Sequence, residues 1–259
     1  MVPGAFEVVC EIELPTRPDL MHVRHQIGVL SKVASAFLIP DNHIGRATVS
    51  SVAVAHEVEQ MGGRSIACLN ARDRNLLGFR RDLLTAAAYG VDQFLLVYGD
   101  SPVSGTRTGA LTVRSMIEEL RDFSETPAFQ TGRSPRVGVT TRLGPLPAWK
   151  QAADFLFVQV SFSLDALLRW RETVEFEGPV YAGVMVLSSS SMARKLATDL
   201  PQIGIPAHWV DAVDQDCDAG VELACDLVAQ VRDSGAFSGV HLVPVSRYRL
   251  VAARLESRI

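Results

Sequence analysis

The chain has 259 residues, of which 47% are hydrophobic and 21% are charged. Its 25 lysines and arginines are outnumbered by 29 aspartates and glutamates, which argues against a nucleic-acid-binding protein because such proteins carry an excess of basic side chains. The four cysteines show no CxxC spacing, and the sequence opens without a basic segment followed by an apolar one. We therefore expect reduced thiols, no signal peptide and no membrane span, as in a soluble cytoplasmic protein.

Short hydrophobic runs of strand length recur along the whole chain. They lie at 7–14, 35–41, 65–71, 93–100, 136–141, 154–162, 180–187 and 239–246. Between them lie amphipathic segments with helical spacing, such as 19–34 and 80–91. Strands that are hydrophobic throughout and alternate with helices predict a parallel sheet covered by helices.

Eight such strands leave about 32 residues for each unit, enough for one strand, one helix and two loops. We predict the α/β class and a single (β/α)8 barrel, a TIM barrel, that takes up residues 1–259 as one domain. An open doubly wound sheet is the alternative. The segment 205–213 is expected to be an irregular or helical insert, because a clear helical pattern at 218–235 follows it. The serine run 188–191 predicts the N-cap of a helix.

Polar side chains interrupt or follow several of the predicted strands. Glu11 lies in the first run, Asp100 directly after the fourth and Gln159 within the sixth. A buried carboxylate or amide without partners is costly, and the active sites of (β/α)8 barrels lie at the C-terminal ends of the strands. These residues therefore predict a binding site at that end, although Asp100 alone would equally fit a turn or helix cap.

Motifs of several other enzyme classes are incomplete in the sequence. The stretch HEVEQ (56–60) lacks the second histidine of a zinc site, GTRTGA (105–110) is not a phosphate-binding loop, and GxGxxG does not occur. The six histidines show no ligand spacing. We expect no metal site.

Several segments, in order along the chain, resemble the methylenetetrahydrofolate reductase family. CEIELPTR (10–17) is similar to the family's first strand, in which a glutamate is followed four residues later by proline. The stretch from LNARDRN to GDSP (69–102) resembles the family segment that ends in Gly-Asp-x-Pro. AADFLFVQVSF (152–162), GPVYAGVMVL (178–187) and SGVHLVPVSR (238–247) are similar to its last three strands.

The resemblance implies an enzyme that reduces the methylene bridge of 5,10-methylenetetrahydrofolate to the 5-methyl group, with hydride from NAD(P)H passed through FAD. Glu11 and Asp100 would be catalytic, with Glu11 as the acid that protonates the folate. The substrate would contact Gln159, Asp100 and Asn42. The implied FAD contacts are Cys68, Asn70, Tyr98, Gly99, Asp100 and Thr140.

The chain departs from the family pattern at positions near the implied flavin. Tyr98 stands where many members have arginine, Cys68 where many have histidine, and the loop after the fifth strand lacks the family's Tyr-Pro-Glu-x-His. Two alternatives follow from this. One is a divergent paralogue with weakened or lost flavin binding that acts on another C–N bond in specialised metabolism, and the other is a folate-binding partner subunit. The sequence also leaves a homo-oligomer open.

Overall fold

The computed structural model describes residues 4–126, 129, 133–199 and 203–258. Within them, parallel strands close into a barrel in which each strand pairs with the next and β8 pairs with β1. The strands are β1 (Glu7–Glu11), β2 (Ala36–Ile39), β3 (Ser65–Asn70), β4 (Gln93–Val97), β5 (Arg136–Thr141), β6 (Phe155–Val160), β7 (Val180–Met185) and β8 (Gly239–Val243). The predicted (β/α)8 barrel is confirmed, and the open doubly wound sheet is wrong.

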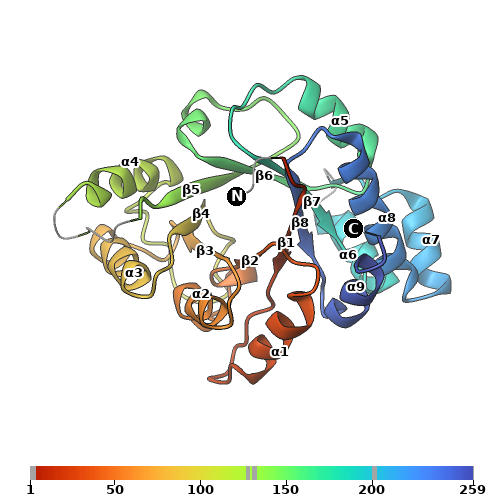
Figure 1. The fold of residues 1–259 in the computed structure, drawn as a ribbon, viewed down its shortest axis with the longest axis horizontal. Coiled ribbons are helices and arrows are strands. Elements are labelled where there is room, and N and C mark those ends of the chain that lie inside the picture. The colour runs from red at the N-terminus through yellow and green to blue at the C-terminus, as the bar shows by residue number, and fades with distance from the viewer. Residues whose placement is uncertain (1–3, 127–128, 130–132, 200–202, 259) are drawn as a thin grey trace.

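Helices surround the barrel in chain order (Figure 1). They are α1 (Met21–Leu30), α2 (Ser51–Gln60), α3 (Leu76–Ala88), α4 (Val113–Ser124), α5 (Leu164–Glu172), α6 (Ser190–Asp199), α7 (Ala207–Gln215), α8 (Ala219–Ser234) and α9 (Tyr248–Leu255), with short 3-10 turns η1 (His43–Gly45) and η3 (Ala148–Ala152). The predicted insert is helical and forms α7. The predicted serine cap is also present, because the Ser189 hydroxyl accepts a hydrogen bond from the amide of Met192 in the first turn of α6.

The inside of the barrel is filled by side chains rather than open. Val9, Leu38, Cys68 and other alternate strand residues form a buried cluster with the rings of Phe155, Phe157 and Tyr181. Glycines make room for these rings: a Cβ atom at Gly138 would lie 2.0 Å from the ring of Phe155. A second, larger cluster packs the outer face of the sheet against the helices.

A cluster of hydrogen-bonded polar side chains lies at the N-terminal end of the barrel. The Tyr181 hydroxyl donates to Glu7 Oε2 at 2.5 Å, and Arg64 pairs with the other oxygen of Glu7 at 2.7 Å. Burial, followed by the hydrogen bond to Glu7, raises the pKa of the Tyr181 phenol. These groups are paired with one another, so the chemistry has to be sought at the other end of the barrel.

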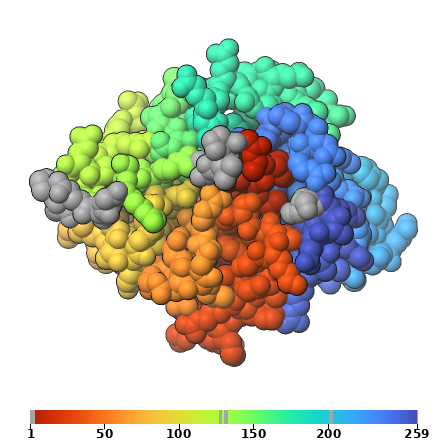
Figure 2. Space-filling model, viewed as in Figure 1, coloured from red at the N-terminus to blue at the C-terminus, as the bar shows by residue number. Residues whose placement is uncertain are grey.

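The ring of helices closes where the two ends of the chain meet. Helix α1 packs against α9, and the ring of His25 meets Tyr248 edge-on. In Figure 2 the red-orange surface of α1 and the dark blue surface of α9 lie against each other. In the part of the chain that the structure describes, every helix is too short or too polar to cross a bilayer.

Candidate functional site

All eight strands run in the same direction around the closed barrel, so their C-terminal ends and the loops that follow lie at one end. We call this end the mouth. It is the end at which (β/α)8 barrels carry their active sites. The predicted residues Glu11, Asp100 and Gln159 come from β1, the loop after β4, and β6, and all three therefore belong to the mouth.

A carboxyl and an imidazole group meet at the mouth. Glu11 Oε2 and His241 Nε2 are 3.1 Å apart, and the two side chains are 16% and 13% exposed. The His241 ring stacks on Phe157, with ring centroids 5.3 Å apart and an interplanar angle of 8°. A hydrogen-bonded pair of this kind can hold and deliver one proton. Because Phe157 fixes the imidazole plane, the direction of the Glu11 carboxyl is fixed as well.

His241 was not among the predicted site residues. The sequence signals were the polar residue inside the apolar run of β8 and the Gly-x-His resemblance. Its partnership with Glu11 depends on the pairing of β8 with β1, which exists only because the barrel closes.

Gln159 keeps its carboxamide free for a ligand. The side chain is partly exposed on β6, and it makes no hydrogen bond with any residue that the structure describes. An amide offers one donor and one acceptor side by side, which suits the edge of a heterocyclic ring.

A second group of polar residues near the mouth is hydrogen-bonded to other residues of the protein. Asp41 Oδ2 accepts from the Asn70 amide at 2.9 Å, from Asn70 Nδ2 at 2.6 Å and from Arg74. Asn70 Oδ1 accepts from the amide of Asp73 at 2.9 Å. Asn70 is fully buried. Its amide group therefore joins the loops after β2 and β3 and has no free donor or acceptor for a cofactor.

Arg72 extends this network to the loop after β4. Its side chain is 2% exposed, and it donates to Asp73 Oδ1 at 2.6 Å and to the carbonyl of Asp100 at 2.6 Å. The hydrogen bond from Arg72 lowers the pKa of Asp73 to about 2. Asn42, which has a left-handed backbone with φ 49°, donates to Asp73 Oδ2 and accepts from the amide of Thr48.

Asp100 is exposed, and one of its two carboxylate oxygens has a structural role. Oδ2 accepts from the amide of Ile44 at 2.9 Å. The same two loops pack so closely that a Cβ atom at Gly45 would lie 2.0 Å from the carbonyl oxygen of Ser101. No described residue hydrogen-bonds to Oδ1 of Asp100, so that oxygen is available to a ligand.

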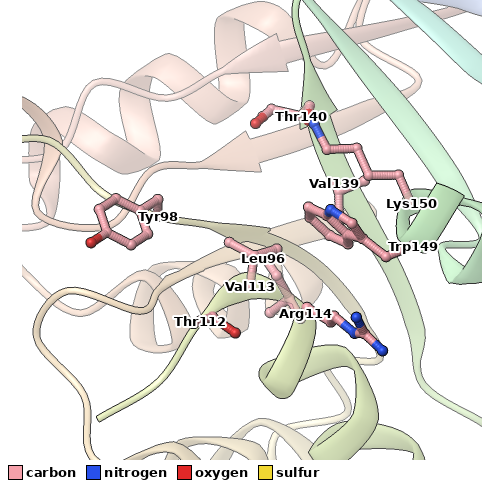
Figure 3. A pocket seen from close by; sticks show the side chains of 9 residues that line it. All are labelled: Leu96, Tyr98, Thr112, Val113, Arg114, Val139, Thr140, Trp149 and Lys150. Atoms are coloured by element: carbon pink, nitrogen blue, oxygen red, sulfur yellow. The ribbon is translucent and has the colours of Figure 1, made fainter. Parts of the chain in front are cut away.

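A cavity of about 390 Å³ lies between β4, β5, η3 and the start of α4 (Figure 3). Figure 3 shows Tyr98 and Trp149 on either side of Leu96. Lys150 Nζ donates to the carbonyl of Thr140 at 2.8 Å, and burial, followed by the charge of Arg142, lowers the pKa of this lysine. Aromatic walls beside a cation suit a planar ligand with a negative group.

The sequence profile of methylenetetrahydrofolate reductase matches residues 29–257 of this chain. The chain belongs to the methylenetetrahydrofolate reductase family. None of the curated proteins matches it significantly.

Three solved structures show the same fold as this member of the methylenetetrahydrofolate reductase family. The first is an uncharacterised protein from Clostridium thermocellum that binds two copies of 5-methyl-5,6,7,8-tetrahydrofolic acid, with a TM-score of 0.64 and 9% identity over 98% of this chain and 94% of that one. The second is 7,8-dihydropteroate synthase from Vibrio fischeri ES114, with a TM-score of 0.53 and 10% identity over 98% and 92%. The third comes from the tryptophan synthase complex of Pyrococcus furiosus, with a TM-score of 0.52 and 13% identity over 97% and 95%.

The flavin that the family resemblance implies can be tested against the predicted contact residues. Cys68 is 5% exposed within the barrel, and burial, followed by the nearby charges of Glu11 and Asp41, raises the pKa of its thiol well above the usual value. Asn70 is consumed by Asp41 and Asp73.

The remaining predicted flavin contacts differ in what they could provide. Gly99 fits closely against Asn70, since a Cβ atom at Gly99 would lie 3.1 Å from that of Asn70. Tyr98 and Thr140 line the cavity, and Asp100 has one free oxygen. The predicted residues therefore do not fit FAD as a set, because the two most buried of them present no polar group to it.

Proposed function

We propose that the protein binds a reduced folate at its mouth and reduces the methylene bridge of 5,10-methylenetetrahydrofolate to a 5-methyl group, with NAD(P)H as the source of hydride. The observation that carries this proposal is the Glu11–His241 pair, partly exposed at the mouth of a barrel that belongs to this family. The Clostridium thermocellum protein of the same fold, which binds 5-methyl-5,6,7,8-tetrahydrofolic acid, supports the choice of ligand.

In this proposal Glu11 acts as the general acid. A proton delivered to one nitrogen of the bridge lets its bond to the methylene carbon break and leaves an iminium at the other nitrogen. Hydride then adds to the methylene carbon and gives the methyl group. The proton comes from Glu11, and His241 holds the carboxyl in place and returns a proton to it from solvent.

The remaining predicted substrate contacts differ in what they can offer. Gln159 has a free carboxamide and recognises the pterin edge. Asp100 has one free oxygen, which we assign to the pterin side as well. Asn42 is held by Asp73 and Thr48, so we assign it to shaping the loop after β2.

The test compares two neighbouring carboxylates. Glu11→Gln keeps the size of the side chain but cannot donate the same proton, and we expect kcat to fall about 100- to 10,000-fold with folate affinity little changed. Glu13→Gln is the matched control, because Glu13 accepts from the hydroxyl of Ser246 at the exposed rim, and we expect its kcat to stay close to that of the wild type. Equal losses in the two variants would remove Glu11 from the mechanism.

A second variant tests whether the hydrogen bond from His241 to Glu11 is needed for proton delivery. His241→Phe keeps a ring on Phe157 but loses the bond to Glu11. We expect a lower kcat and an altered pH profile, with the substrate KM little changed. An unchanged pH profile would show that His241 is not part of the proton-delivering pair.

A member of the family without flavin, which either transfers hydride directly from NAD(P)H or only binds folate, is the second candidate. It is favoured by the burial of Cys68 and the internal pairing of Asn70. The visible spectrum of the purified protein decides between the routes. Absorbance of oxidised flavin would show that FAD binds despite the poor fit of the predicted contacts. A colourless protein that oxidises NAD(P)H only when folate or another substrate with a C–N bond is added supports direct transfer. A colourless protein that binds folate without turnover supports a binding subunit.

A further inference from the structure

Strand β6 carries one more residue than β7 along the stretch that leads to the mouth. Phe157 pairs with Tyr181, but the next pair is Val160 with Gly183, which is three steps along β6 against two along β7. This is a β-bulge, and it contains Gln159. Bulges next to binding sites commonly redirect a side chain.

Gly183 makes the bulge possible by leaving space. A Cβ atom at Gly183 would lie 2.5 Å from the carbonyl oxygen of Val158, 2.7 Å from the nitrogen of Val160 and 2.9 Å from the carbonyl carbon of Gln159. All three are backbone atoms of the bulge, so none can move aside as the end of a flexible side chain could. Gly183 is not among the residues with positive φ, so space rather than an unusual backbone conformation requires the glycine.

The residues directly before and after the bulge are held in place, whereas the side chain of Gln159 within it is partly exposed. Phe157, directly before it, is 1% exposed and stacked under His241. The Ser161 amide, directly after it, donates to the carbonyl of Gly183 at 2.9 Å. Between these two fixed points, the carboxamide of Gln159 is partly exposed and has no partner in the described residues.

We propose that Gly183 is a positioning residue, and that its missing Cβ lets β6 bulge so that Gln159 is aimed at the folate. The inference rests on the proposed function, since it requires a folate at the mouth. It makes Gly183, which touches no reacting atom, a determinant of folate affinity through a side chain on the neighbouring strand.

The test is a double-mutant cycle with 5-methyltetrahydrofolate as the ligand. We expect Gly183→Ala to raise the dissociation constant about 10-fold, the value of one well-aligned hydrogen bond, and Gln159→Ala to do the same. The double variant should be no weaker than Gln159→Ala alone, because both changes remove one interaction. Gly28→Ala is the control: the space around this helical glycine is open, and affinity should be unchanged.

Each outcome separates the inference from the proposed function. If the wild type binds the folate and Gly183→Ala binds equally well, or if its effect adds in full to that of Gln159→Ala, the inference is refuted alone. If the wild type binds no reduced folate, the proposed function is refuted and this inference with it.

If Gly183→Ala does not fold, as judged by circular dichroism, hydrogen exchange of the wild type takes its place. Bound folate should then slow exchange in residues 158–161, and unchanged exchange there would refute the inference.

Discussion

Asp41 provides a sharp test of the polar network that shapes one side of the mouth. The substitution Asp41→Asn keeps the shape of the side chain and removes its charge. Asp41 is 6% exposed and Arg74 is 12% exposed. Burial alone would lower the pKa of Arg74, but the charges of Asp41 and Asp82 outweigh it and the pKa is raised. The charged form of the buried Arg74 guanidinium is therefore stabilised by Asp41 and Asp82.

The magnitude follows from what the substitution leaves behind. Breaking a buried ion pair costs about 3–5 kcal/mol, because the remaining charge is left without compensation. Arg74 retains Asp82 at 2.9 Å, so we expect the lower end, about 3 kcal/mol. The amide group of the new side chain would in addition face the donors of Asn70, which now point at Asp41.

Urea unfolding measures the effect directly. With a slope of about 2–3 kcal/mol per molar urea for a chain of this size, the midpoint should fall by about 1 M with the slope unchanged. Glu118→Gln is the control, since Glu118 and Arg114 form an exposed pair, 60% and 67% accessible, and its loss should cost less than about 0.5 kcal/mol. A cost below about 1 kcal/mol for Asp41→Asn would refute the reasoning.

Two further predictions concern pH and thiol reactivity. The pKa of Asp73 in the folded protein, about 2, lies below its ordinary value, so its contribution to stability is complete above about pH 4 and is lost as the pH falls from about 4 to about 2. Asp73→Asn should cost about 1–2 kcal/mol in urea unfolding at pH 7 and much less near pH 2, and an equal cost at both values would contradict this assignment. Cys217 is the exposed thiol, whereas the others are buried, so we expect a thiol reagent to react rapidly with one cysteine of the native protein. Cys217→Ser should abolish this fast phase, and a remaining fast phase would show that Cys68 or another core thiol is accessible.

The fold was largely predictable because parallel strands covered on both faces are hydrophobic throughout and stand out against amphipathic helices. The boundaries were less accurate. The fourth strand was predicted to reach Asp100 but ends at Val97, because Gly99 turns with φ 87° and the chain leaves the sheet. Between β5 and β6 the described residues form η3 rather than a full helix.

Candidate residues such as Glu11 and Gln159 could be found from the sequence alone, because a polar side chain in a hydrophobic strand is costly and needs a reason. What such a residue does depends on partners that local sequence does not specify. The family resemblance implied that Asn70 contacts FAD, yet its side-chain amide donates to Asp41 from the neighbouring loop. His241 meets Glu11 across 230 positions of the chain.

The sequence by itself determined the alternation of strands and helices, the family and the residue types near the mouth. Only the tertiary structure decided which polar groups are paired and which are free. Hydrogen bonds between different strands and loops form only when the barrel closes and brings donor and acceptor atoms of distant segments within about 3 Å of each other.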